Sequence, residues 1–396
     1  MAEAEEIRME ENIRKDIDSA VEQFRDMLVE QYERNERMRE ARLAGASVDA
    51  HDDRTVIGLA PGDGIGPVIM QEAHAVLNKL LSDELASGKI ELREITGFTI
   101  GDRLAAGETV PSDVLRQLEQ CDVLLKGPTT TPNAAMGGQN LESANVFLRK
   151  HFDLFANVRP VSIPEKGIDW TFFRENTEGE YALGSRGVRL GTDLAVDFKV
   201  TTDEGSRRIA KAAFDFAAAN GKKKVTIVTK ANIMKKTDGD FQKICLETAE
   251  NYPGIETECY FVDIMAANLI NEDIRSGFSV FVLPNLYGDI ITDEAAQIQG
   301  GVGTAGSANI GSNYAMFEAI HGSAPRMIEE GIGHLANPAS LMTAAVMMLR
   351  HIGLADKAAA LEAAVAAADG QLGARMTGLP GGATCREFAD LVLAEL

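Results

Sequence analysis

Hydrophobic and polar positions along most of the chain predict strands and helices in alternation. Short apolar runs typical of buried strands precede segments with apolar residues every three or four positions, which is helical spacing. The predicted strands are residues 55–60, 123–125, 224–229, 256–262 and 278–284. The predicted helices are 67–81, a segment that Thr201 and Glu204 open as a capping box and that ends at 219, then 240–252, 337–353 and 355–368. This alternation predicts an α/β protein with a mainly parallel sheet.

The first 50 residues follow a different pattern. They are rich in Glu and Arg and contain no Pro. Their apolar residues recur at steps of three and four, at Ile13, Ile17, Val21, Phe24, Leu28 and Tyr32. This spacing predicts one amphipathic helix, ended by a linker at residues 44–47. The helix is expected either to pack on the protein's own surface or dimer, or to dock a partner or form a coiled coil.

Composition narrows the class of protein. A chain of 396 residues suits two domains or one large bilobal enzyme. The net charge of -21 argues against a nucleic-acid partner and against an anionic membrane surface. The four cysteines are scattered without a C-x-x-C pair, which indicates a reducing, cytoplasmic setting. No apolar run has transmembrane length, and the acidic N-terminus lacks the features of a signal or transit peptide.

Two acids four residues apart are the first candidate site. Asp289 and Asp293 follow the buried strand 278–284 and a predicted turn at Gly288. In a helix they share one face, at the carboxyl edge of the sheet where open α/β folds bind ligands. Carboxylates there suit Mg²⁺ or Mn²⁺, and Asp263, at the end of strand 256–262, is a candidate third ligand. The alternative is a solvated acidic helix face.

Residues 61–67 form a glycine-rich segment after the first strand. The third glycine of a dinucleotide-binding fingerprint would fall at Pro67, so the segment predicts only a tight strand-to-helix turn. A second strand ends in Lys126-Gly-Pro-Thr-Thr-Thr131. The residues beyond it form a candidate set for binding a polycarboxylate, with surface charge as the alternative. They are Ser143, Asn145, Arg149, Arg159 and Arg174.

Tyr181 and Lys230 are candidate proton-transfer groups. Lys230 closes the buried strand 224–229, where desolvation would lower its pKa into a useful range. A solvent-directed lysine and a packed tyrosine are the alternatives. In the loop 318–325, the imidazole of His321 and the adjacent Gly322 are candidates to contact a cofactor, although an isolated loop histidine is commonly polar surface.

From Thr55 to the C-terminus, the chain resembles the β-decarboxylating dehydrogenases, which act on isocitrate, isopropylmalate, homoisocitrate and tartrate or malate. Several motifs carry the resemblance in the same order along the chain. They are Gly62-Asp-Gly-Ile-Gly66, Phe173-Arg-Glu-Asn176, Lys230-Ala-Asn-Ile-Met234, Asn285-Leu-Tyr-Gly-Asp289-Ile-Ile-Thr-Asp293, His321-Gly-Ser-Ala-Pro325 and Asn337-Pro338. The resemblance implies oxidation by a nicotinamide cofactor, then loss of CO₂, with Mg²⁺ or Mn²⁺ as a Lewis acid.

The resemblance also implies roles by position. Lys230 looks like the base that takes the hydroxyl proton, and Tyr181 like the acid that reprotonates the product. The metal ligands would be Asp263, Asp289 and Asp293, and the carboxylate clamps Arg149, Arg159 and Arg174. The cofactor contacts would be Lys126, Thr131, His321, Gly322, Ala324, Arg326 and Asn337. Lys230 and Asp263 would serve the site of a second subunit, which implies a homodimer or larger homo-oligomer.

The implied fold is two-lobed and isopropylmalate-dehydrogenase-like. Residues 51–154 and 300–396 would form the large cofactor-binding domain, and 155–299 the small domain with the dimer contacts. Residues 1–50 would be an added helical extension.

Ser143 and Asn145 indicate the substrate, because isocitrate enzymes place Ser-x-Asn before the first arginine to meet a third carboxylate. The loop 133–140 is longer than the resemblance leads us to expect. Because Ser143 and Asn145 match the isocitrate pattern, isocitrate is the predicted substrate. The alternatives are isopropylmalate, homoisocitrate, malate or tartrate, or a regulatory subunit of a heteromeric isocitrate dehydrogenase.

The cofactor prediction is NAD, with NADP as the alternative. Arg326-Met327 matches neither the Lys-Tyr typical of NADP enzymes nor the Asp-Ile typical of NAD enzymes. The missing Tyr and the C-terminal segment Gly378–Cys385 favour NAD, whereas Arg326 suits a phosphate.

Overall fold

A computed structural model of the chain describes residues 2–44, 54–131, 141–184, 186–190, 194–301, 303 and 305–396, with side chains from residue 12 onward. The predicted linker after Ala44 and the long loop 133–140 lie outside these residues.

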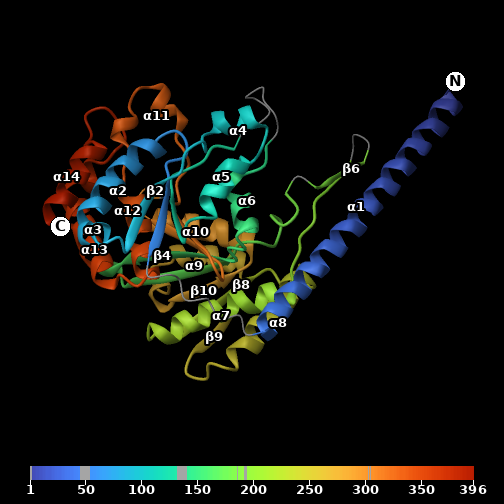
Figure 1. Ribbon diagram of the computed structural model, residues 1–396. Coiled ribbons are helices and arrows are strands. Elements are labelled where there is room, and N and C mark those ends of the chain that lie inside the picture. Colours follow the sequence, from blue (N-terminus) through green and yellow to red (C-terminus); the bar gives the residue numbers. More distant parts are fainter. Residues whose placement is uncertain are drawn as a thin grey trace.

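Among the described residues, ten strands form one mixed sheet through the body (Figure 1). Their spatial order is β2 (Ile90–Glu94), β1 (Thr55–Ala60), β3 (Val123–Lys126), β12 (Ala315–Ala319), β11 (Gly306–Ile310), β4 (Ala156–Ile163), β5 (Ile168–Glu175), β10 (Val280–Leu283), β8 (Lys224–Thr229) and β9 (Glu256–Phe261). Pairing is antiparallel only between β12 and β11, β11 and β4, and β4 and β5. The predicted α/β class with a mainly parallel sheet is confirmed.

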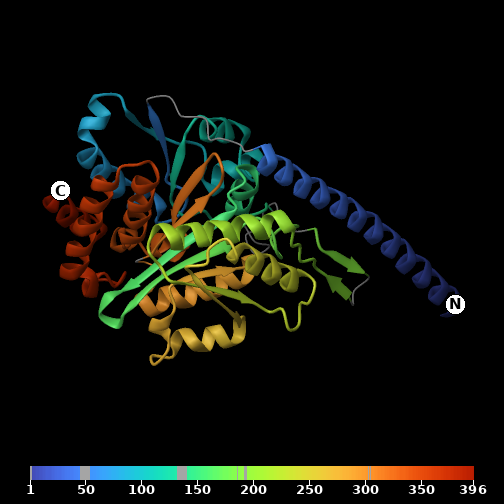
Figure 2. The ribbon, with the colours of Figure 1, turned by 90° about the horizontal axis from the view of Figure 1, so that it is seen from below.

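Helices cover the sheet, and a small hairpin stands apart from it. The helices are α1 (Ala2–Ala44), α2 (Gly66–Leu80), α3 (Ser82–Ala86), α4 (Ile100–Ala106), α5 (Ser112–Leu118), α6 (Ala144–His151), α7 (Asp203–Ala219), α8 (Thr237–Ala249), α9 (Val262–Ile270), α10 (Asn285–Gln299), α11 (Pro325–Glu329), α12 (Ala339–His351), α13 (Ala355–Leu372) and α14 (Cys385–Glu395). Short 3-10 turns occupy Pro164–Lys166, Arg275–Gly277, Gly333–Leu335 and Gly373–Arg375. The hairpin pairs β6 (Val188–Leu190) with β7 (Leu194–Val196) and lies beside α1 (Figure 2).

The buried apolar residues form separate clusters at different parts of the sheet. Two clusters of buried apolar residues draw only on residues before 155 and after 305, while two others draw only on residues 156–295. Such separate cores are typical of lobes or domains. We therefore propose the division predicted above, with 51–154 and 300–396 in one lobe and 155–299 in the other.

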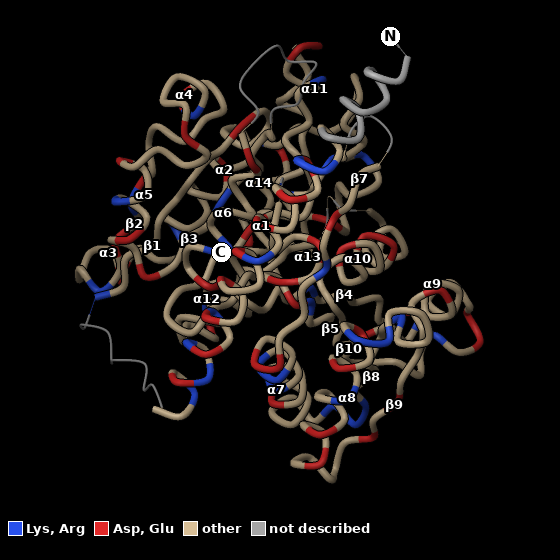
Figure 3. Tube along the Cα trace, turned by 90° about the vertical axis from the view of Figure 1, so that its right-hand side faces the viewer, with Lys and Arg blue, Asp and Glu red and all other residues tan. Residues whose placement is uncertain are grey.

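The predicted N-terminal helix is present as α1, which projects from the body so that its N-terminal end lies far from it (Figures 1 and 2). Acidic and basic residues are interspersed along the described part of the trace (Figure 3), so the net charge of -21 is not confined to one element. Within the described residues, no helix combines the length and apolar character needed to cross a membrane.

Two local predictions were wrong. Thr202, not Thr201, caps α7 by accepting a hydrogen bond from the Gly205 backbone N–H at 3.1 Å, and the Glu204 carboxylate binds Arg42 of α1. An ion pair with an arginine is stronger than the hydrogen bond from a backbone N–H that the Glu204 carboxylate would accept in a capping box. Gly288 is not a turn either, because α10 already begins at Asn285. Gly288 allows close packing, since a Cβ there would lie 2.5 Å from Arg174 Cγ.

Candidate active site

A polar cavity of about 310 Å³ is lined by residues at or just after the carboxyl ends of β3 and β12 and of β5 and β10, two parallel pairs that run in opposite directions in the sheet. Its lining combines residues from both sequence halves of the body. They include Thr129, Ser143, Asn145, Arg149, Arg159, Arg174, Tyr181, Asp289, Asp293, Glu318, His321 and Gly322. All five predicted substrate residues, two of the three predicted metal ligands and Tyr181 therefore share one cavity.

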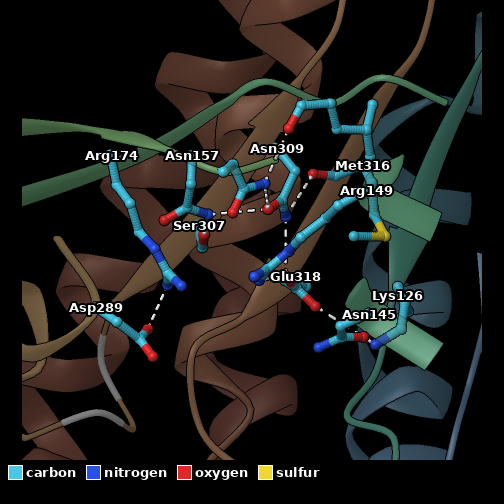
Figure 4. A network of polar contacts seen from close by, with 12 residues as sticks. Lys126, Asn145, Arg149, Asn157, Arg174, Asp289, Ser307, Asn309, Met316 and Glu318 are labelled. Carbon is cyan, nitrogen blue, oxygen red and sulfur yellow. Dashed lines mark hydrogen bonds and ion pairs between the residues drawn. The ribbon is translucent and has the colours of Figure 1, made fainter. Parts of the chain in front are cut away.

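Asp289 and Asp293 are held on one face of α10 by two buried arginines. Arg174, on β5, forms an ion pair with Asp289 (Figure 4). Arg159, on β4, lies 3.0 Å from Asp293 Oδ1 and 3.4 Å from Asp289 Oδ1. Burial alone would raise the pKa of Asp289, but Arg174 and Arg159 outweigh it and lower that pKa. Asp289 is therefore ionised at neutral pH, as a metal ligand must be.

The Tyr181 hydroxyl donates a hydrogen bond of 2.9 Å to Asp289 Oδ2. Burial and the negative charge of Asp289 both raise the pKa of Tyr181. The phenol therefore keeps its proton at neutral pH, the state that a proton donor needs.

Two of the three arginines retain unused hydrogen-bonding capacity. The Nε atoms of Arg149 and Arg159 are buried without a partner in the described part of the chain. Unpaired buried donors are costly, and a carboxylate ligand is a natural partner for a guanidinium. Ser143 begins α6, yet its hydroxyl makes no capping hydrogen bond, while Asn145 Oδ1 accepts one from Thr129 Oγ1 at 3.2 Å. The cavity is therefore suited to a small polyanion.

One wall of the cavity contains a charged cluster that the sequence did not reveal. Glu318 Oε2 lies 3.4 Å from Lys126 Nζ, and Glu318 Oε1 lies 3.2 Å from Arg149 Nη2 (Figure 4). Asn309 Nδ2 donates to Glu318 Oε1 at 2.9 Å. Burial opposes the carboxylate, but Lys126 and Arg149 outweigh it and hold the pKa of Glu318 at about 2. The only indication of this cluster in the sequence was one acidic residue, Glu318, within the apolar run Ala315–Ala319.

Only some of the predicted cofactor residues line the cavity. His321 and Gly322 line the cavity, and His321 Nε2 is buried without a partner among the described residues. Lys126 is fully buried behind the lining. The remaining four lie away from the lining: Thr131, Ala324, Arg326 and Asn337.

The turn at 61–67 is confirmed as a tight strand-to-helix connection. Gly62 and Gly64 have positive φ, and a Cβ on Gly64 would lie 1.9 Å from the Ser323 carbonyl oxygen. Asp63 Oδ2 accepts a hydrogen bond from the Thr130 backbone N–H at 2.8 Å. Thr130 Oγ1 in turn lies 2.8 Å from Ser323 Oγ. The turn therefore joins the segment after β3 to the loop that carries His321.

Lys230 and Asp263 do not line the cavity of their own chain. They pair with each other, with Lys230 Nζ 2.5 Å from Asp263 Oδ1. The Lys230 side chain is partly exposed, and Asp263 lies in the first turn of α9 rather than at the end of a strand. Within the described residues, no three of His, Cys, Asp and Glu gather as a metal site. A single chain thus presents two of the three predicted metal ligands to the cavity.

Comparisons with known proteins support the predicted family. The sequence model of the isocitrate/isopropylmalate dehydrogenase family matches residues 56–392. The chain is 40% identical over 342 residues to the mitochondrial isocitrate dehydrogenase (NAD) subunit alpha of Macaca fascicularis, covering 84% of this chain and 93% of that protein. It is 41% identical over 320 residues to the isocitrate dehydrogenase (NADP) of Rickettsia bellii, covering 78% of this chain and 62% of that protein.

A solved structure also matches. The crystal structure of isocitrate dehydrogenase from Methylococcus capsulatus superposes with a TM-score of 0.74 at 34% identity, covering 86% of this chain and 99% of that chain.

Proposed function

Because the chain belongs to the isocitrate/isopropylmalate dehydrogenase family, we propose that it oxidises and decarboxylates isocitrate to 2-oxoglutarate with a nicotinamide cofactor. The observation that carries this proposal is the convergence of Arg149, Arg159 and Arg174 with Ser143 and Asn145 on one cavity. Three guanidiniums supply bidentate sites for carboxylates. Ser143 and Asn145 supply neutral polar contacts for a further carboxylate.

The residues present fit a divalent metal ion. Asp289 and Asp293 offer oxygen ligands on one helix face, which suits Mg²⁺ or Mn²⁺, and Asp263 of a second subunit is the proposed third ligand. When bound, the ion supplies a Lewis acid that stabilises negative charge on the substrate oxygen. Arg174 and Arg159 orient the two acids and balance their charge.

For proton transfer, we propose Tyr181 as the acid and Lys230 of a second subunit as the base. The protonated phenol beside Asp289 and the absence of Lys230 from its own cavity support this assignment. The proposal requires a homodimer or larger homo-oligomer. We also propose a cytoplasmic location.

His321 and Gly322 are the proposed contacts to the nicotinamide cofactor, because they line the cavity and His321 Nε2 lacks a partner among the described residues. The cofactor supplies the hydride acceptor. NAD is the proposed form, because Met327 stands where NADP enzymes carry Tyr. NADP is the alternative, because relatives bear both names and the exposed Arg326 suits a phosphate.

Steady-state assay of the purified chain tests the function. Threo-isocitrate with Mg²⁺ or Mn²⁺ is expected to reduce NAD faster than NADP. Turnover of isopropylmalate or malate without turnover of isocitrate would overturn the substrate assignment. Activity from this chain alone would exclude a purely regulatory subunit.

Replacing Asn145 tests the specificity assignment. Asn145→Leu is expected to lower kcat/KM for isocitrate by roughly 10–100-fold, because a buried polar contact to the substrate is lost. Malate lacks the third carboxylate, so its slower turnover should change little. An equal loss for both substrates would contradict a selective role for Asn145.

A shared site can be tested by complementation. Lys230→Met and Tyr181→Phe chains should each be nearly inactive as homodimers. Mixed and reassociated in equal amounts, they should regain about a quarter of wild-type activity, because half the two-fold dimers then hold one intact site of two. No recovery, despite exchange of subunits verified by mass spectrometry of tagged chains, would place both groups in one chain's site.

A further inference from the structure

The helix α1 carries an apolar stripe that the described part of the chain leaves largely exposed, although the Phe24 ring stacks on Phe198 with ring centroids 5.0 Å apart. Its six members are each at least 40% exposed. They are Ile13, Ile17, Val21, Phe24, Leu28 and Tyr32. A contiguous apolar surface of this kind on a projecting helix marks an interaction site.

The helix cannot turn this stripe onto its own body, because other contacts fix its orientation. Met27 is buried against Ala182 and Leu183, and Arg34 Nη1 lies 2.7 Å from Glu178 Oε1. Further along, Arg42 Nε lies 2.8 Å from Glu204 Oε2. At 3.6 residues per turn, the centre of the stripe lies about 90–110° around the helix from Met27 and Arg34, and about 30° from Arg42. Along residues 13–32 the stripe therefore lies beside the contacts of Met27 and Arg34, with most of its surface open to another chain.

The spacing of the stripe is symmetric. Its successive steps are four, four, three, four and four residues, which read the same in either direction. A two-fold axis crossing the helix between Glu22 and Gln23 exchanges Ile13 with Tyr32, Ile17 with Leu28, and Val21 with Phe24. An antiparallel second copy therefore places an apolar residue opposite every member of the stripe. Such self-complementarity is the property of an isologous two-fold interface.

The charges at the two ends of α1 favour the same arrangement. Residues 2–11 contain five Glu and one Arg, whereas residues 34–43 contain four Arg and two Glu. The same axis sets these two segments side by side, and of the arginines there, Arg37 and Arg39 are exposed. A parallel pair would instead place acid-rich ends together. Antiparallel helix dipoles also attract.

The charge balance argues against a membrane as the occupant. Amphipathic helices that bind anionic membranes carry Lys and Arg on the polar face. Between residues 12 and 32 the chain has three basic and five acidic residues. We propose that α1 is an assembly element that pairs antiparallel with α1 of a second copy of this chain, in the register given above.

Light scattering of full-length variants tests the pairing. Val21→Glu places a charge in the stripe and is expected to halve the molar mass of the wild-type assembly. Val29→Glu is the matched control, because Val29 is equally exposed at 52% but faces away from the stripe. Its mass should equal the wild type's. An unchanged mass for Val21→Glu, or equal dissociation by both variants, would overturn the proposal.

Cysteine crosslinking tests the direction. The background is Cys259→Ser, since the other three cysteines are buried. A mixture of Ile13→Cys and Tyr32→Cys chains should form the mixed disulfide, and neither chain alone should crosslink, because like positions would be about 28 Å apart along the axis. Crosslinking of either chain with itself would overturn the antiparallel register. Sedimentation of the wild type with anionic vesicles, but not of Val21→Glu, would assign the stripe to a membrane instead.

Discussion

Asp289→Asn should lower kcat/KM for isocitrate about a thousandfold at low Mg²⁺, which corresponds to about 4 kcal/mol of transition-state stabilisation. The substitution removes a proposed metal ligand and the charge that pairs with buried Arg174 and accepts from the Tyr181 hydroxyl. The loss should shrink at high Mg²⁺, because mass action restores occupancy of a weakened metal site. Steady-state kinetics across a Mg²⁺ series measures this dependence.

Glu294→Gln is the matched control, since Glu294 lies one position beyond Asp293 on α10 and does not line the cavity. Its kinetics should stay close to wild type at every Mg²⁺ concentration. An equal loss for Asp289→Asn at all concentrations would contradict weakened metal binding. Asp289 would then serve only to hold Arg174 and Tyr181 in position.

Glu318→Gln should destabilise the fold by about 3–5 kcal/mol, because it leaves Lys126 and Arg149 buried without a counter-charge. The amide has nearly the shape of the acid, so the loss reports charge rather than packing. Urea unfolding measured by circular dichroism gives the free energy of unfolding. The surface pair Glu330–Arg326, at 3.4 Å, provides the control, and Glu330→Gln should change stability by less than about 1 kcal/mol.

The same carboxylate predicts a pH dependence. Its folded pKa of about 2 lies below the usual value, so its stabilisation is fully present above the unfolded pKa, near 4.3. That stabilisation is lost as the pH falls from about 4.3 towards 2. Wild type should therefore lose stability over this range more steeply than Glu318→Gln. Identical acid profiles for the two proteins would contradict the role of the buried ion pair.

The strands and most helices were predictable because their periodicity is local. The strands at 55–60 and 224–229 have their predicted bounds, since short segments rich in β-branched residues leave little choice of position. The acid pair on α10 was also predictable, because a spacing of four places side chains on one helix face whatever the surroundings. The errors at Thr201 and Gly288 lie where a side chain distant in sequence, Arg42 or Arg174, contacts the segment.

The charged cluster of Lys126, Arg149 and Glu318 depends on the order of the strands in the sheet, not on local periodicity. Lys126 and Glu318 are register partners on the parallel strands β3 and β12, although 192 residues separate them. Asn157 and Asn309 are likewise partners on β4 and β11. A charged residue within an apolar run shows that a partner is needed, but not which residue supplies it.

By itself, the sequence determined the α/β class, the positions of the principal strands, the amphipathic N-terminal helix and the residue types that a polycarboxylate and a divalent metal require. Only the tertiary structure decided which strands are neighbours, and so which arginine faces which acid. The structure also shows that Lys230 does not line its own chain's cavity and that most of the apolar stripe of α1 is exposed. Periodicity and side-chain chemistry act over a few residues, whereas ion pairs and exposed faces depend on segments that meet only when the sheet is assembled.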